Sequence, residues 1–109
     1  MQNGFFESEW SPERTQILSV DGADCGYCVV EHRPDDIHVR ELVIHPDFQG
    51  RGIGTVFLRR LQREAAESGV PMRLGTFQLN HAIRLYERLG FRQIGTTQSH
   101  VLLEWRAGP

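Results

Sequence analysis

Apolar residues recur every fourth position after residue 52, and this spacing predicts a long amphipathic helix over residues 52–68. Four of them share one face of the helix: Ile53, Phe57, Leu61 and Ala65. The opposite face carries arginine and glutamate, which is typical of a face in contact with solvent. Gly69 and Pro71 end the helix, because glycine accepts the left-handed conformation after a last turn and proline cannot continue a helix.

Short stretches with apolar and β-branched residues predict strands on both sides of this helix. In chain order we expect strands over 15–20, 26–31 and 37–45, the long helix, a strand over 72–77, a short helix over 81–89, and strands over 91–96 and 100–106. This β-β-β-α-β-α-β-β order predicts an α+β fold with two helices and a mixed, mainly antiparallel sheet. Strand 72–77 follows a helical crossover, so we expect it to run parallel to strand 37–45.

Length and composition are those of one globular domain: 109 residues, 39% hydrophobic and 24% charged. We expect one domain over residues 15–109. Residues 1–14 form an N-terminal segment that is either a helical turn or partly ordered. A formal net charge of −2 gives no reason to expect a nucleic-acid partner. No apolar run is long enough to cross a membrane and no signal peptide is evident, so we expect a cytoplasmic protein.

Cys25 and Cys28 form a lone C-x-x-C pair. A zinc site needs two further ligands, for which His32, His38 and His45 are the nearby candidates. Residues three apart on a regular strand point to opposite faces, so the two thiols are expected to diverge. We therefore expect reduced strand cysteines and no metal site.

The segment Gln49–Gly54 contains three glycines between the apolar run Leu42–Ile44 and the start of the long helix. A helix N-terminus has backbone N–H groups without partners and favours negative charge. Glycine removes the Cβ atoms that would hold a phosphate away from those groups, and Arg51 adds a cation. The segment is thus a candidate phosphate-binding loop. The alternative is a tight strand-to-helix connection.

The spacing of these glycines excludes two common nucleotide loops. A P-loop requires Lys followed by Ser or Thr after its last glycine, and the dinucleotide fingerprint requires Gly-x-Gly-x-x-Gly. Gln49, Gly52 and Gly54 instead fit (Gln/Arg)-x-x-Gly-x-(Gly/Ala), the acyl-CoA pyrophosphate loop of the Gcn5-related N-acetyltransferases (GNAT). Residues 41–55 resemble this family throughout, and residues 80–91 resemble its second conserved block. The resemblance covers about residues 15–106.

This resemblance implies a short family member that lacks the usual N-terminal strand and helices, which commonly line the acceptor pocket. An open sheet edge at that place favours self-association. We therefore expect a homodimer, with the segment that contains Phe5, Phe6 and Trp10 as a candidate cover of the edge.

The family's activity implies direct transfer of the acetyl group of acetyl-CoA to a primary amine of a small molecule or peptide. The alternative is a catalytically silent acyl-CoA-binding or regulatory module of the same fold. By position, the backbone N–H of Leu42 faces the thioester oxygen. The residues that the resemblance assigns to the acetyl-CoA site are Leu42, Val43, Ile44, Gln49, Gly50, Arg51, Gly52, Ile53, Gly54, Thr55 and Asn80.

Tyr86 matches the family tyrosine that lies near the cofactor sulfur, which makes it the candidate general acid, although a tyrosine at this helical spacing is also a normal core residue. Glu41 is the candidate general base, and His38 is its rival. The two lie on opposite faces of a regular strand, so one of them at most reaches the acetyl group unless a bulge intervenes. Asn80 lies six residues before Tyr86, where the family more often has seven.

Overall fold

The computed structural model of the chain describes residues 5–7 and 15–108. Its elements, in chain order, are β1 (Phe5–Glu7), β2 (Thr15–Val20), β3 (Ala23–His32), β4 (Ile37–Ile44), the short 3-10 helix η1 (Pro46–Phe48), α1 (Ile53–Ser68), β5 (Met72–Phe77), α2 (Ala82–Arg88), β6 (Arg92–Thr96) and β7 (His100–Trp105). Every strand and helix predicted over residues 15–106 is present, with ends that differ by three residues or fewer.

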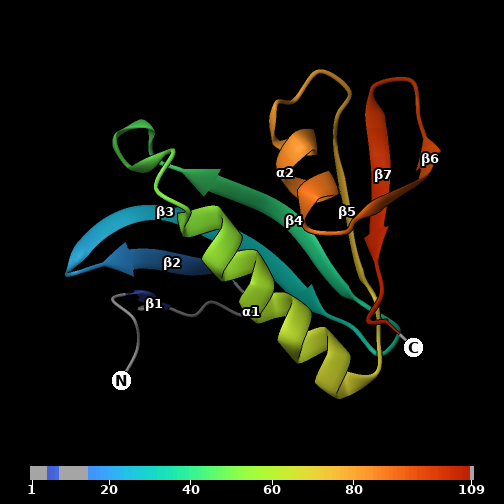
Figure 1. The fold of residues 1–109 in the computed structure, drawn as a ribbon, viewed down its shortest axis with the longest axis horizontal. Coiled ribbons are helices and arrows are strands. Elements are labelled where there is room, and N and C mark those ends of the chain that lie inside the picture. The colour runs from blue at the N-terminus through green and yellow to red at the C-terminus, as the bar shows by residue number, and fades with distance from the viewer. Residues whose placement is uncertain (1–4, 8–14, 109) are drawn as a thin grey trace.

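The described strands form one seven-stranded sheet in the order β1-β2-β3-β4-β5-β7-β6 (Figure 1). Its neighbouring strands are antiparallel except β4 and β5, which are parallel as predicted. The α+β fold class is therefore confirmed. The sequence pattern predicted six strands, and the seventh is β1, which pairs with β2. The expectation of a helical turn is therefore wrong for residues 5–7. Trp10 and the rest of the N-terminal segment lie outside the described residues.

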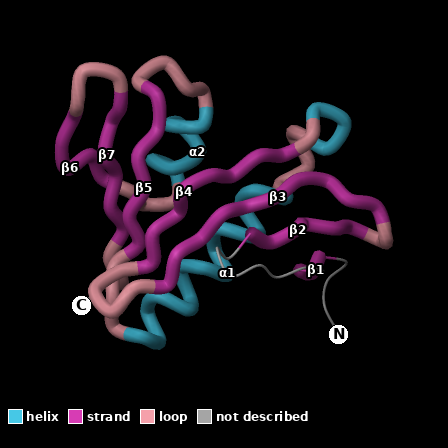
Figure 2. The backbone as a smooth tube through the Cα atoms, turned by 180° about the vertical axis from the view of Figure 1, so that it is seen from behind, coloured by secondary structure: helices cyan, strands magenta, loops and turns pink. Residues whose placement is uncertain are grey.

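Both helices cover the same face of the sheet (Figures 1 and 2). The apolar side of α1 is buried there through Phe57, Leu58 and Leu61. The two helices are also joined directly, because the Gln62 side-chain Nε2 donates to the backbone oxygen of Leu89 at 2.9 Å. One hydrophobic core lies between the sheet and this helical layer. The opposite face, called the outer face below, carries neither of the two described helices.

The two parallel strands separate after three residue pairs. The register Ile37↔Met72, His38↔Arg73 and Val39↔Leu74 has no continuation, and beyond Val39 the strands β4 and β5 diverge (Figure 1). The edge of β4 that faces β5 therefore has no strand partner from residue 40 to its end. The backbone on this edge is available to a ligand that enters between the strands.

A bulge in β4 changes which side chains share a face. Val29 pairs with Glu41 while Val30 pairs with Val39, so Arg40 is an extra residue without a partner on β3. An inserted residue reverses the alternation that follows it. Glu41 therefore lies on the outer face together with His38, and the expectation from a regular strand, that these two side chains point to opposite faces, is wrong.

A second bulge, in β3, explains the two cysteines. Leu18 pairs with Gly26 and Ser19 with Asp24, which leaves Cys25 as the extra residue. Cys25 and Cys28 are both fully buried in the core beneath the helices, so the expected divergence of the thiols is wrong. Both are free thiols, and burial raises the pKa of Cys25.

Among the described residues, no group of three or more His, Cys, Asp or Glu side chains is arranged to hold a metal ion. No described helix is long and apolar enough to cross a membrane.

Candidate active site

The glycine loop ends in an open helix N-terminus. Gly50 and Gly52 have φ angles of 80° and 78°, a left-handed conformation that glycine adopts without strain. Gly52 is the N-cap of α1 and supplies no side-chain hydrogen bond. A Cβ atom at Gly50 or Gly52 would meet nothing within 4 Å. The first-turn N–H groups of α1 therefore lack a side-chain cap, and the space beside the two glycines is free for an anion.

This loop borders a cleft of about 700 Å³ between the end of β4 and α2, called the loop cleft below. Its lining includes ten of the eleven residues assigned to acetyl-CoA from the sequence: Leu42, Val43, Ile44, Gln49, Gly50, Gly52, Ile53, Gly54, Thr55 and Asn80. Arg51 is the exception, because its guanidinium lies over the ring of Phe48, 5.2 Å from the ring centre. The cleft is also lined by Phe48, His81, Ala82, Leu85, Tyr86 and Arg88.

Two polar side chains of the loop cleft hold its walls in place. The Gln49 side-chain Nε2 donates to the backbone oxygen of Ile44 at 2.9 Å, which ties the glycine loop to the end of β4. The Asn80 side-chain Nδ2 donates to Thr76 Oγ1 at 2.7 Å, and its Oδ1 accepts from the backbone N–H of Ala82 at 2.8 Å. Asn80 thus fixes the start of α2 against β5, a capping arrangement that asparagine favours.

A second cavity, of about 290 Å³, occupies the gap where β4 and β5 separate and is called the strand gap below. It is lined by residues 39–43 of β4 and 74–77 of β5, with Asn80, Tyr86 and His100. Leu42, Val43, Asn80 and Tyr86 line both cavities. The loop cleft and the strand gap therefore adjoin, and Tyr86 lies where they meet.

Tyr86 is buried, with 6% of its surface exposed, and its ring packs edge-to-face on Phe91 with ring centres 5.7 Å apart. Burial raises its pKa to about 12, and the nearby Cys28 thiol adds to the shift. The phenol therefore keeps its proton at neutral pH. The two interpretations from the sequence, core residue and candidate acid, are compatible, because this side chain packs in the core and also lines both cavities.

The two candidate bases lie in different cavities although they share the outer face. Glu41 is exposed and lines the strand gap. His38 lines a third cavity farther along the outer face, and its Nδ1 is buried without a hydrogen-bond partner. Burial lowers the pKa of His38, and the charge of Arg33 lowers it further. Of the two, Glu41 is the one that shares a cavity with Tyr86.

Sequence reasoning missed the far wall of the strand gap. Thr76, Phe77 and His100 line it, and the rings of Phe77 and His100 lie against each other at a tilt of 36°, with centres 4.5 Å apart. These residues come from β5 and β7, and they reach the site because the parallel strands separate. The sequence carries no local signal for that separation.

Comparison with known proteins agrees with this geometry. The family model described as the acetyltransferase (GNAT) domain matches residues 11–93. The chain belongs to the GNAT acetyltransferase family. Among curated proteins, an uncharacterised N-acetyltransferase of Methanocaldococcus jannaschii is 28% identical over 95 residues, which cover 84% of this GNAT chain and 40% of that protein.

Solved structures show the same fold. The PaiA N-acetyltransferase of Thermoplasma acidophilum, in complex with coenzyme A, matches with a TM-score of 0.77 at 18% identity, over 85% of this chain and 60% of that one. The ribosomal-protein-S18-alanine N-acetyltransferase of Escherichia coli matches with a TM-score of 0.74 at 22% identity, over 99% and 74% of the two chains. This GNAT chain thus spans well under half of the curated relative and three-fifths of the PaiA enzyme.

Proposed function

We propose that this chain transfers the acetyl group of acetyl-CoA directly to a primary amine. The observation that carries the proposal is the meeting of the loop cleft and the strand gap at Tyr86. The loop cleft has the features of a phosphate-binding site. The strand gap exposes the backbone of β4, the carboxylate of Glu41 and the phenol of Tyr86. Family membership supports acetyl transfer, and the coenzyme A bound to the PaiA enzyme supports the choice of donor.

The donor fits the features of the loop cleft. The uncapped N-terminus of α1 and the glycines before it suit a pyrophosphate. Arg88, which also lines the cleft, offers a cation for a further phosphate group. Leu42, Val43 and Ile44 lie on the unpaired edge of β4, and their backbone groups suit the amide groups of a pantetheine arm. In this proposal the backbone N–H of Leu42 supports the thioester oxygen.

Acetyl transfer requires two proton movements, and the strand gap offers a group for each. Acetyl-CoA supplies a thioester whose carbonyl carbon an amine can attack. Glu41, directly or through one water, takes a proton from the ammonium form of the bound amine, and the neutral nitrogen then attacks the thioester carbon. Tyr86 gives its proton to the sulfur as the carbon–sulfur bond breaks, so the products are an acetylated amine and CoA with a free thiol. The second proton leaves the nitrogen as the amide forms and restores the phenol of Tyr86. No covalent enzyme intermediate is required, so neither buried cysteine has a role.

The role of Glu41 gives a test through the pH dependence of turnover. We expect Glu41→Gln to lower kcat/KM by roughly 100-fold at pH 7, as is typical for loss of a general base. The loss is smaller at pH 9, because a larger share of the amine is already neutral there. The measurement is release of CoA thiol from acetyl-CoA together with mass spectrometry of the acetylated amine.

The matched control is Glu64→Gln. Glu64 lies on α1, where its Oε1 is 3.1 Å from His32 Nε2, and it does not line the loop cleft or the strand gap. We expect its kinetics to equal those of the unaltered protein. Acetyl-CoA that binds and yields no acetylated amine would contradict the proposal and identify a silent acyl-CoA-binding module. An equal loss at both pH values would remove Glu41 as the base.

A further inference from the structure

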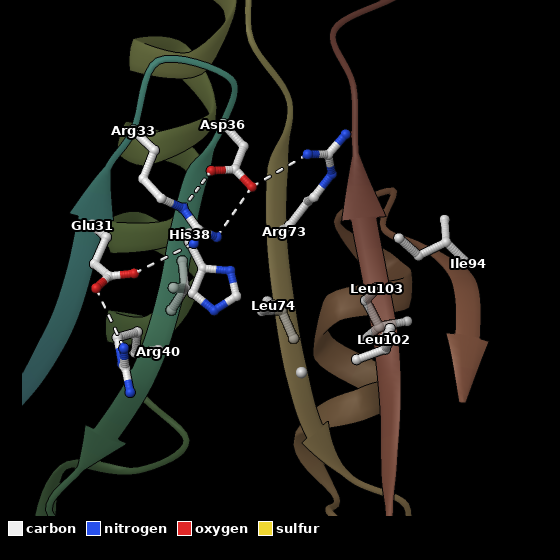
Figure 3. A pocket seen from close by; sticks show the side chains of 12 residues that line it. Glu31, Arg33, Asp36, His38, Arg40, Arg73, Leu74, Ile94, Leu102 and Leu103 are labelled. Carbon is white, nitrogen blue, oxygen red and sulfur yellow. Dashed lines mark hydrogen bonds and ion pairs between the residues drawn. The ribbon is translucent and has the colours of Figure 1, made fainter. Parts of the chain in front are cut away.

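The strand gap continues onto the outer face of the sheet. A third cavity, of about 610 Å³, lies there over β4, β5 and β7 and is called the outer pocket below (Figure 3). It shares Val39, Arg40, Leu74 and Gly75 with the strand gap. The three cavities therefore form one path from the glycine loop, past Tyr86, to the outer pocket. An acceptor that approaches from the side opposite the donor would lie in this pocket.

Most charges of the outer pocket are held by fixed partners. The Asp36 carboxylate accepts from Arg33 Nε at 2.8 Å and from Arg73 Nη1 at 3.3 Å. Arg73 also donates through Nε to Glu104 at 2.9 Å. Figure 3 shows Asp36 between the two arginines. These groups join β5, β7 and the β3–β4 turn, and their charges largely cancel, so they are structural rather than available to a ligand.

Arg40 differs from these arginines. It is the extra residue of the β4 bulge, and 59% of its side chain is exposed. Its one recorded contact in the described part of the chain runs from Nη1 to Glu31 Oε2 at 3.3 Å. A guanidinium has five N–H donors in a fork that matches a carboxylate. Arg40 lines both the outer pocket and the strand gap, and its guanidinium has donors beyond the one that Glu31 accepts.

The neighbouring residue is Glu41, the base of the proposed function. Both residues line the strand gap, so one positive and one negative residue border the same cavity. A molecule with an amine and a carboxylate on adjacent carbons matches that pair. Apolar side chains lie farther out, where Ile94 and Leu102 line the outer pocket and are 54% and 37% exposed.

From this juxtaposition we propose that the acceptor is an amino acid or a similar amino carboxylate, with its carboxylate bound by Arg40 and its amine presented to Glu41. An apolar side chain of the acceptor contacts Ile94 and Leu102. The inference rests on the proposed function and names the acceptor class for the same site. Arg40 acts in binding, so its loss changes KM more than kcat.

The test compares L-leucine with L-leucinamide as acceptors. The two share an amine and a side chain, and the amide lacks the carboxylate. The amide has the less basic amine, so amine reactivity alone favours it. We expect leucine nevertheless to have at least a tenfold lower KM. Arg40→Gln raises the KM for leucine at least tenfold with little change in kcat, and it removes most of the preference for leucine over leucinamide.

Arg106→Gln is the matched control, because Arg106 is 62% exposed, bonds Glu104 and does not line the outer pocket. Equal or better turnover of leucinamide, or an unchanged KM of Arg40→Gln for leucine, would overturn the inference. Leucine that neither reacts nor shifts the Arg40 side-chain NMR signal of the CoA-loaded protein would overturn it too. Titration with acetyl-CoA distinguishes failure of the proposed function from failure of this inference. A protein that does not bind acetyl-CoA contradicts the proposed function. A protein that acetylates amines without preferring a carboxylate contradicts only the acceptor class.

Discussion

Tyr86 shows how burial changes the proton affinity of a side chain. Its ring packs on Phe91 within the core, and burial raises its pKa to about 12. A phenol with an ordinary pKa near 10 begins to lose its proton in mildly alkaline solution. Tyr86 stays protonated there, so it remains a proton donor over the whole range in which an amine becomes neutral. In the proposed function this lets one site use a neutral amine and an intact acid together.

Removal of this hydroxyl gives a specific prediction. We expect Tyr86→Phe to lower kcat about 100-fold and to leave the KM for acetyl-CoA within roughly twofold, because the proton is needed as the carbon–sulfur bond breaks and not for donor binding. The ring and its packing remain, so stability changes little. Steady-state kinetics and urea unfolding check both parts. Tyr27→Phe, on β3, is the control, and an unchanged kcat in Tyr86→Phe would exclude the acid role.

The sequence predicts correctly which residues lie side by side where those residues are close together in the chain. The run Leu42–Ile44 and the loop Gln49–Gly54 are separated by four residues, so a strand, a turn and a helix start necessarily bring them together. Arg51 was not predictable, because the left-handed glycines on both sides of it decide where its side chain points, and it lies over Phe48. Gln49 lines the loop cleft, and its side chain bonds the backbone of Ile44; its role in binding the pyrophosphate stays a prediction.

At the scale of elements, the contact of β3 with the end of β4 depends on Gly26. A Cβ atom at Gly26 would collide with the backbone oxygen of Val43, a residue that lines both the loop cleft and the strand gap. Gly26 pairs with Ile44, where β4 leads into the glycine loop. The glycine therefore allows β3 to lie closely against the strand that forms one wall of the site.

We expect Gly26→Ala to lower the free energy of unfolding by about 1–3 kcal/mol, because backbone atoms must move to make room for the added methyl group. Urea unfolding followed by circular dichroism measures this. Gly108→Ala is the control, since a Cβ atom there meets nothing within 4 Å and its φ angle is ordinary. Gly26→Ala that is as stable as the unaltered chain would contradict the described approach of the two strands.

The extent of each strand and helix followed from hydrophobic spacing and turn residues, but the irregularities did not. The bulges at Arg40 and Cys25 depend on how β4 and β2 align with β3, which is a matter of long-range packing. Their consequences are large. They bring Glu41 to the face of His38 and bury both cysteines in one core. Strand alternation read from the sequence fails at such positions because the inserted residue has no local signature.

At the scale of the whole molecule, the helices lie on one face of the sheet (Figures 1 and 2). The proposed acceptor pocket lies on the other face. The separation of β4 and β5 connects the two faces. The short strand β1 pairs with residues 18–20 of β2, so Phe5–Glu7 cover that half of the strand, as expected for the segment that contains Phe5 and Phe6. Self-association as a homodimer and a cytoplasmic location stay predictions.

The central claim is that the loop cleft binds acetyl-CoA through the glycine loop, and calorimetric titration with acetyl-CoA tests it most directly. We expect a Kd on the order of micromolar for the unaltered chain, a usual range for substrates. Gly54→Glu tests the phosphate-binding loop. Its Cβ atom makes an ordinary 3.5 Å contact with Leu85, and an acidic residue in the first turn of α1 favours the helix. The variant therefore folds while it places a negative charge in the cleft.

The control is Val56→Glu, which adds the same charge to the same helix at an exposed residue outside the cleft lining. We predict that Gly54→Glu weakens acetyl-CoA binding at least tenfold, since like charges repel at short range, and that Val56→Glu changes it much less. No binding by the unaltered chain, or an affinity unchanged in Gly54→Glu, would contradict the account.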